Sequence, residues 1–301
     1  ATIELPLKHG LAVLRQFERI ASEYIERREK RLLPFFPPEP AENAIPTNFI
    51  WARTIRCPHC EGLVPLSPNW RLAPDGTGVR LLPDKGKGPG DKTRHLHFEI
   101  VSTAKEHSTS TVSGGDATCP FDDCGRLIAG DHIKAEAQAG RMGQQLYTVV
   151  FKKKLITGHT KAGKPKEKWV RGYRAPRPED DVSEAVADAL TEKLPDWEAL
   201  DMVPTERVPE DINDDRPIQY GMPLWRDLFS PRQLLGHCTA VEVFRELIVE
   251  EKSFGRWNEC TAAAFCYLSF SLDKLRDYNS RMSRWHVNRE VMVNTFDRHD
   301  F

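Results

Sequence analysis

The chain has 301 residues, of which 40% are apolar, so it can bury a core as one large or two ordinary domains, which excludes an intrinsically disordered chain. The 43 basic and 44 acidic side chains give a net charge of −1, which excludes no class of partner until charge is resolved along the sequence. The longest nearly apolar run, Ala262–Leu272, contains two serines and is too short to span a bilayer. We therefore expect a cytoplasmic protein.

The N-terminal segment predicts a long amphipathic helix followed by a stiff connector. Between Leu7 and Leu33, apolar residues recur at the helical period, with Arg and Glu on the other face. Pro34 ends this pattern, and further prolines extend the connector to about residue 46. Because the sequence starts at Ala1 rather than Met, we expect that either end could be an excision boundary within a larger protein.

Two cysteine pairs carry the strongest signal in the sequence. A strand predicted from Asn48 to Arg56 leads into the first pair, Cys57 and Cys60, which has C-x2-C spacing. The second pair, Cys119 and Cys124, has C-x4-C spacing and follows after 58 intervening residues. Two short loops that each present two thiolates have the ligand spacing of a tetrahedral structural zinc site. The alternative is four ordinary buried cysteines. We expect Zn²⁺ to bind to Cys57, Cys60, Cys119 and Cys124.

The residues around the pairs fit the same interpretation. Gly62 and Gly125 follow the two loops, where we expect the left-handed backbone conformation of a metal knuckle. The three remaining cysteines fall in helical patterns and are predicted to be core residues: Cys238, Cys260 and Cys266. An odd total of seven thiols indicates a reducing compartment rather than a disulfide framework.

Histidines between the cysteine pairs raise a rival interpretation, a nuclease with a His-centred metal site. His95, His97 and His107 lie there, but the Asn and following metal-binding His that such a site needs are missing from the sequence. His95 and His97 would face one side of a strand predicted from His95 to Ser102, without a nearby Asp or Cys. We therefore interpret them as structural. The C-terminal cluster is interpreted as solvated or capping: Asp297, His299 and Asp300.

A basic β-hairpin is predicted from Gln145–Lys154 and Lys166–Arg174, joined by residues 157–163. Residues 152–177 hold ten bases and one acid, a net charge of +9, and residues 178–215 hold fourteen acids and two bases, a net charge of −12. We expect the hairpin to contact the DNA backbone through Lys152, Lys153, Lys154, Lys166, Lys168, Arg171 and Arg174.

The hairpin also carries aromatic residues that could stack on bases or sugars: Tyr147, Phe151, Trp169 and Tyr173. Two alternatives remain open. The aromatic side chains could form the core face of a solvated hairpin, or the cations could pair with the acidic segment that follows.

The last third of the chain is predicted to be helical. Ser230, a proline at the first helical position and Gln233 form a capping box, followed by an apolar helical face. A second helix is predicted from about Asn258 to Tyr278.

Several stretches resemble the middle of large bacterial DNA methyltransferases of the adenine-specific type, whose N-terminal region is a domain of unknown function. The resemblance covers nearly the whole chain and rests on residues 49–60 (FIWARTIRCPHC), 112–120 (VSGGDATCP), 139–143 (AGRMG), 220–235 (YGMPLWRDLFSPRQLL), 272–280 (LDKLRDYNS) and 294–301 (NTFDRHDF). It implies a transfer of a methyl group from S-adenosylmethionine to an exocyclic amine of DNA. The cysteine quartet occupies the matching positions.

The chain departs from that family in its catalytic motifs. It contains no Phe-x-Gly-x-Gly methyl-donor motif, and its only Pro-Pro, Pro37-Pro38, follows Phe36 where an acceptor for the target amine is required. We therefore assign no catalytic residue. The resemblance implies that S-adenosylmethionine binds only to a catalytic methyltransferase domain outside this chain, joined in cis or as a separate subunit.

The resulting prediction is an α+β fold in three parts. Residues 1–45 form the N-terminal helix and connector, residues 46–176 a zinc-ribbon-like β-rich region with the basic hairpin, and residues 177–301 an acidic helical segment and C-terminal helices. The expected function is DNA engagement and scaffolding within a methyltransferase. The alternative is a stand-alone zinc-ribbon module that binds nucleic acid or protein and has no catalytic activity.

Overall fold

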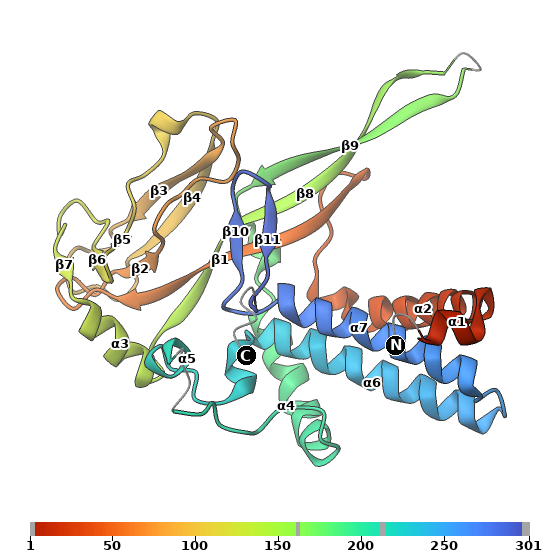
Figure 1. The fold of residues 1–301 in the computed structure, drawn as a ribbon. Coiled ribbons are helices and arrows are strands. Elements are labelled where there is room, and N and C mark those ends of the chain that lie inside the picture. Colours follow the sequence, from red (N-terminus) through yellow and green to blue (C-terminus); the bar gives the residue numbers. More distant parts are fainter. Residues whose placement is uncertain (1–3, 161–162, 211–214, 297–301) are drawn as a thin grey trace.

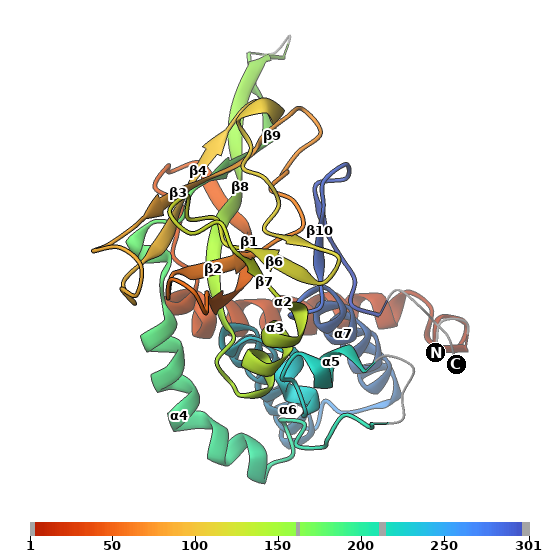
Figure 2. The same cartoon turned by 90° about the vertical axis from the view of Figure 1, so that its left-hand side faces the viewer.

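Strands gather above a bundle of helices in the structure (Figure 1), and a view turned by 90° shows the same two layers (Figure 2). The computed structural model describes residues 4–160, 163–210 and 215–296. It confirms a mixed helical and β fold that contains a cysteine cluster. The predicted C-terminal cluster of Asp297, His299 and Asp300 lies outside the described residues.

The central sheet has four antiparallel strands in the order β2-β1-β8-β9. The strands are β1 (Ala44–Arg56), β2 (Leu63–Leu66), β8 (Gly143–His159) and β9 (Pro165–Arg174). β1 pairs with β8 from Ala44 opposite Lys153 to Thr54 opposite Gly143. The strand that leads into Cys57 therefore lies inside the sheet rather than at its edge. The predicted hairpin is confirmed, with β8 extending five residues further toward the turn than its predicted end at Lys154.

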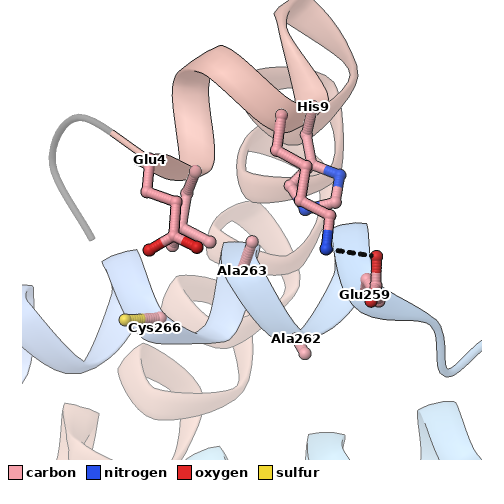
Figure 3. A pocket seen from close by; sticks show the side chains of 8 residues that line it. Glu4, His9, Glu259, Ala262, Ala263 and Cys266 are labelled. Carbon is pink, nitrogen blue, oxygen red and sulfur yellow. Dashed lines mark ion pairs between the residues drawn. The ribbon is translucent and has the colours of Figure 1, made fainter.

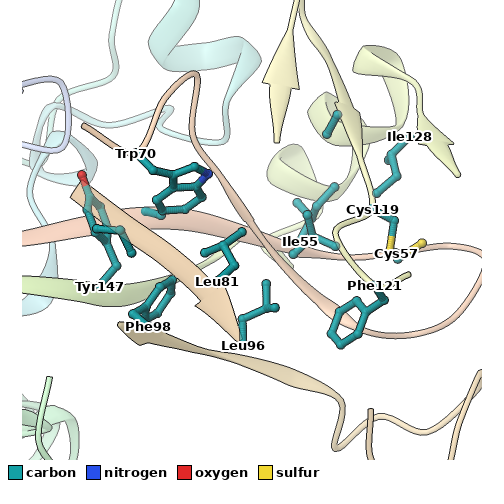
Figure 4. Packing of buried hydrophobic residues seen from close by; sticks show 14 of the residues in the cluster. Ile55, Cys57, Trp70, Leu81, Leu96, Phe98, Cys119, Phe121, Ile128 and Tyr147 are labelled. Carbon is teal, nitrogen blue, oxygen red and sulfur yellow. The ribbon is translucent and has the colours of Figure 1, made fainter. Parts of the chain in front are cut away.

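Two smaller sheets and two short helices complete the β region. Their elements are β3 (Gly78–Asp84) paired with β4 (His95–Val101), η2 (Ala104–Glu106), β5 (Val112–Ser113), β6 (Asp116–Thr118), β7 (Leu127–Ile128) and α3 (Gly130–Gln138). One core unites these sheets, since apolar side chains from β1, β3, β4 and β8 meet those of the cysteine loops (Figure 4). Trp70 is among its largest fully buried side chains, 5.3 Å from the Tyr147 ring and 6.1 Å from the Phe98 ring.

A separate core lies between helices from the two ends of the chain: α1 (Glu4–His9), α2 (Leu11–Leu32), α6 (Pro231–Ser253) and α7 (Glu259–Tyr278). The single predicted N-terminal helix is wrong in one respect, because Gly10 adopts φ +53° and divides it. The predicted capping box of α6 is confirmed, since the Ser230 backbone N–H donates to Gln233 Oε1 at 2.9 Å. Arg27 and Arg31 of α2 pair with Glu250 and Glu246 of α6.

A third cluster joins the acidic segment to the bundle. Its helix α4 (Ser183–Ala199) packs Leu190 and Trp197 against Leu235 and Cys238 of α6. Cys238 is therefore buried as predicted, whereas Cys260 and Cys266 are only half-buried. The remaining short elements are η1 (Leu33–Phe35), η3 (Pro178–Asp180), α5 (Arg216–Gln219), η4 (Trp225–Leu228), β10 (Arg284–His286) and β11 (Val291–Val293).

Side chains from the C-terminal part of the chain also pack on strands of the central sheet. Arg232 of α6 lies over Phe49 and Trp51 of β1, with its Cζ 4.2 Å and 5.4 Å from the ring centroids. Trp285 of β10 has its ring centroid 6.4 Å from that of Tyr173 of β9 and donates its Nε1–H to the Leu72 carbonyl at 2.7 Å. The predicted division of the chain at residues 45 and 176 stays a prediction. No helix among the described residues is long and apolar enough to cross a bilayer.

Candidate metal centre and nucleic-acid interface

The four predicted cysteine ligands converge into one cluster. The Cys57 and Cys124 sulfurs lie 3.8 Å apart, the Cys60 and Cys119 sulfurs 3.6 Å apart, and all four lie within 4.8 Å of one another. Metal–sulfur bonds of about 2.3 Å around a tetrahedral ion place the sulfurs about 3.8 Å apart. The donor set therefore fits a single metal ion, with one thiolate of each close pair supplied by each loop.

Each loop is closed by backbone hydrogen bonds that hold its sulfurs inward. In the first, Cys57 donates its N–H to the Gly62 carbonyl at 2.9 Å; in the second, Cys119 donates to the Arg126 carbonyl at 3.0 Å. The Gly125 N–H donates to the Phe121 carbonyl at 2.8 Å. These bonds satisfy backbone groups that a tight turn would otherwise leave unpaired.

The two glycines after the loops differ in their roles. Gly125 adopts φ +59°, as predicted, but the prediction for Gly62 is wrong, because Glu61 carries the left-handed conformation at φ +58°. Gly62 instead makes room for the other loop. A Cβ at this position would lie 2.5 Å from Cε2 of the Phe121 ring.

Burial opposes ionisation of the thiols, and at Cys124 hydrogen bonds from the Arg126 backbone N–H and the other cysteines outweigh it and lower the pKa. At the other two thiols with a shifted pKa, burial prevails. It raises the pKa of Cys57 and of Cys119, although the backbone N–H groups of His59 and Phe121 oppose the shift by bonding to the respective sulfurs. Buried thiolates without a counter-charge are unfavourable. A bound cation would remove that penalty, and Cys thiolates are the protein ligands that soft and borderline metal ions prefer.

An ion pair ties the β3–β4 hairpin to the second cysteine loop. The Arg94 side chain is fully buried, donates to both carboxylate oxygens of Asp123 and lies 4.5 Å from the Phe121 ring centroid. Gly90 donates its N–H to the Cys60 carbonyl at 3.0 Å, which attaches the same hairpin loop to the first cysteine pair. Residues 85–94 are thereby fixed to both cysteine loops.

The structure corrects one premise of the interpretation of His95 and His97, since an aspartate does lie near them, and their structural role stays a prediction. Asp84 comes from the opposite strand of the hairpin, and one ligand atom of each of the three residues lies within 4.8 Å of the others. Sequence reasoning missed Asp84 because it precedes His95 by eleven residues, and only the register of β3 with β4 brings them together. His107 is apart from this group, since its Nε2 lies 2.8 Å from the Gly76 carbonyl oxygen.

The basic hairpin extends outside the body of the protein. The outer part of the hairpin projects beyond the other strands in both views (Figure 1, Figure 2), and we call the described residues 152–160 and 163–171 the arm. From Lys154 to His159, β8 pairs only with β9 among the described strands. Lys166 and Lys168 therefore lie on a ribbon with two accessible faces, whereas Lys152 and Lys153 lie at its base, where β8 still pairs with β1.

The seven predicted DNA-binding residues divide into two groups. Lys152, Lys153, Lys166 and Lys168 are exposed, and no acidic group among the described residues pairs with them. The other three have partners: Lys154 bonds to Glu167 at 2.8 Å, Arg171 to Glu290 at 3.2 Å, and Arg174 to Glu39 and Asp180 at 2.8 Å and 2.5 Å.

Arg174 lies at the base of the arm in a buried ion-pair network. The side chains of Glu39 and Asp180 are 3% and 0% exposed, so these carboxylates need the arginine as counter-charge. Burial opposes ionisation of Asp180, but hydrogen bonds from Arg174 and Arg177 outweigh it and lower its pKa to about 2. The arm is thus anchored to the start of the acidic segment.

Among the predicted stacking residues, only Trp169 is well exposed, at 46%. Tyr147 is a core residue and Phe151 packs on Gly172, where a Cβ would lie 2.4 Å from its ring. Tyr173 donates its hydroxyl to Glu290 at 2.5 Å. The open alternative of core-facing aromatic residues therefore holds for Tyr147 and not for Trp169.

Two surface cavities lie away from the cysteine cluster. One lies between α1 and α7, where Lys8 pairs with Glu259 at 2.9 Å beside Ala262, Ala263 and Cys266 (Figure 3). The other lies beside Trp51 and Asp180. No glycine lines either cavity, so neither has the glycine turn that lets a backbone approach a dinucleotide-like cofactor.

Comparisons of the chain with protein-family models, with curated proteins and with solved structures found no match.

Proposed function

We propose that the chain is the zinc-binding, DNA-engaging and scaffolding segment of an S-adenosylmethionine-dependent DNA methyltransferase. Zn²⁺ is held by Cys57, Cys60, Cys119 and Cys124, whose four thiolates suit a closed structural site with no position for a substrate. The ion fixes the two loops and, through Arg94 and Gly90, the adjoining hairpin.

DNA engagement is assigned to the arm, and the exposed lysines on both of its faces carry this proposal. Cross-strand register places Lys153 opposite Val170 and Leu155 opposite Lys168, so the cations at 153 and 168 share one face, while Lys152 lies on the other. Lys166 and Lys168 lie on the two-stranded part of the hairpin, and Lys152 and Lys153 lie at its base beside β1. Without acidic partners among the described residues, these lysines can reach phosphates along a groove. Trp169 adds a surface on which a base or sugar can stack.

The acidic segment does not account for these lysines. Within its described residues it pairs with bases of the hairpin only at Asp180, which binds Arg174 and Arg177 at the base of the arm. Glu198 pairs with Arg226 instead. The part of the acidic segment that the structure describes thus leaves the charge of the arm available to a polyanion.

The methyltransferase assignment comes from the resemblance of the sequence stretches quoted above. S-adenosylmethionine and the target amine would be bound by a catalytic domain outside this chain, joined to it in cis or as a subunit. This chain's contribution would be to position DNA against that domain. The second candidate, a stand-alone zinc-ribbon module, shares the arm and the cysteine cluster and differs only in lacking that domain.

The test is DNA binding by the chain with Lys153→Gln and Lys168→Gln combined. Removal of each phosphate contact should weaken duplex binding and lower the slope of log K against log salt concentration by about 0.9. The matched control combines Lys30→Gln with Lys105→Gln, two exposed lysines on α2 and η2 without a described acidic partner. The control should bind as the wild type does.

Equal affinity and an equal salt slope for the arm variant and the wild type would remove the arm from DNA binding. Methyl transfer then separates the two candidate functions. Activity should appear when the chain is combined with a domain that carries the methyl-donor and catalytic motifs. Absence of activity in every such combination would leave only the stand-alone module, whereas activity that the arm variant does not lower would remove the arm from the reaction.

A further inference from the structure

The outer face of the β3–β4 hairpin carries three possible metal ligands on a rigid support. Asp84 pairs directly with His95, and His97 follows two residues later on the same face. The opposite face of the hairpin places Leu81, Leu96 and Phe98 in the main core. The ligand-bearing strands are therefore held in place by packing and not by the ligands themselves.

The hydrogen bonds of the group orient its donor atoms. His95 Nδ1 lies 2.9 Å from the Thr93 carbonyl oxygen, and because a carbonyl can only accept, Nδ1 carries the proton. Nε2 of His95 then has the free lone pair that metal binding needs, the arrangement of a ligating histidine supported by a second hydrogen bond. Asp84 Oδ1 accepts from the Gly86 N–H at 3.0 Å, which fixes the carboxylate.

The neighbouring cations pair with carboxylates other than Asp84. Lys85 pairs with Asp122 at 2.7 Å, and Arg94 pairs with Asp123. The His95 and His97 rings lie edge to face with centroids 4.5 Å apart, and both residues belong to the same face of the hairpin because they are two positions apart on β4. One ligand atom from each of the three residues lies within 4.8 Å of the others. Small side-chain rotations would bring these atoms to the shorter spacing of ligands around one metal ion.

We propose that Asp84, His95 and His97 form a second metal site, exposed at the surface, for a divalent transition-metal ion such as Zn²⁺ or Co²⁺. Two imidazoles and one carboxylate are the donor set that such ions accept. Three protein ligands on one open face leave coordination positions for water or for a phosphate oxygen. The site differs from the cysteine cluster, which is buried and fully supplied with ligands.

Both sites share one support. The loop of residues 85–94 that closes the hairpin is bound to the first cysteine pair through Gly90 and to the second through Arg94 and Lys85. Emptying the cysteine site should therefore also weaken metal binding at the histidines, whereas emptying the histidine site should leave the cysteine site intact.

In the experiment, the full chain is first loaded with one equivalent of Co²⁺ and is then titrated with a second equivalent. The first equivalent should give the intense thiolate-to-metal charge-transfer absorption of sulfur ligation, and the second should bind without adding to it. Asp84→Asn and His97→Ala should each weaken binding of the second Co²⁺ by at least about 10-fold. Loss of a residue that only supports a metal ligand already lowers metal affinity by about that factor. Nitrogen-15 spectra of the chain loaded with Zn²⁺, which is diamagnetic, should report binding of His95 through Nε2.

His159→Ala is the matched control, since His159 is exposed on the arm and outside the cluster. This variant should bind two equivalents as the wild type does. Binding of a single equivalent by the wild type would overturn the proposal, as would unchanged binding of the second equivalent by both cluster variants. Since residues 84 and 97 are exposed, circular dichroism should show that both variants are folded.

Discussion

The Phe121 ring of the second cysteine loop occupies the space above Gly62 of the first, so that a Cβ at Gly62 would lie 2.5 Å from Cε2 of the ring. The two loops therefore pack against each other as well as bringing their cysteines into one cluster. Because Phe121 is fully buried and lies beneath Arg94, the ring has no free space into which to move.

Gly62→Ala should destabilise the protein by about 1–3 kcal/mol, the usual cost of inserting a methyl group into a packed interior. Gly236→Ala is the control, since it adds a methyl group at a helical position of α6 where nothing lies within 4 Å of the new Cβ. The control should be neutral or stabilising by about 0.5–1 kcal/mol. Urea denaturation measures both, and equal midpoints for the two variants would contradict the packing argument.

Removal of the bound metal should unfold the β region selectively. Metal-binding free energy becomes folding free energy where the site does not exist in the unfolded chain. The helix bundle has a separate core, so hydrogen exchange after chelation, or in Cys119→Ala, should rise in residues 46–140 and stay low in α2, α6 and α7. Elemental analysis should find zinc in the wild type. Full metal content in Cys119→Ala would contradict the four-thiolate site.

Acid should weaken the base of the arm. Asp180 has a folded-state pKa of about 2 against its usual 3.8, so the unfolded chain binds its proton first as the pH falls. Its stabilising contribution of about 2 kcal/mol is therefore complete above about pH 4 and is lost as the pH falls through about 2.

Asp180→Asn should remove this pH dependence and, at neutral pH, cost about 3 kcal/mol or more, because Arg174 loses a buried partner. The difference in free energy of unfolding between the variant and the wild type should therefore shrink as the pH is lowered from 7 to 2. Asp188→Asn, at an exposed position of α4, should follow the wild type throughout. Parallel curves for Asp180→Asn and the wild type would show that the ion pair has no such role.

S-adenosylmethionine should not bind to the isolated chain. The described cavities have no glycine in their linings, and the sequence lacks the Phe-x-Gly-x-Gly motif. Calorimetry with the cofactor should show no heat of binding, and a methyl-transfer assay on mixed-sequence duplex should show no turnover. Micromolar binding would reveal an active site within this chain.

The cysteine cluster was predictable from the sequence because its cysteines occur in two local pairs. The spacing within each pair is typical of a short turn that presents both sulfurs to one point. The capping box at Ser230 and Gln233 is equally local and is confirmed. The left-handed residue of the first loop was misassigned because glycine tolerates that conformation without requiring it, and Gly62 is retained for the space that Phe121 occupies.

Other features depend on long-range packing that the sequence does not report. Charge alone could not distinguish Arg174, which is paired with buried carboxylates, from exposed Lys153 on the same strand pair. Asp84 could be placed beside His95 only once the register of the β3–β4 hairpin was known. Zinc identity and DNA contact stay predictions.

β8 is a single strand of 17 residues, and its length has a mechanical consequence. Its outer part forms the arm, and its inner part is hydrogen-bonded to β1, which leads directly into Cys57. We therefore expect a force on the arm to reach the first cysteine loop across the hydrogen-bond ladder between β8 and β1, with the Arg174 ion pairs holding the base of the arm. Displacement of the arm would then be coupled to the positions of the first loop's two sulfurs.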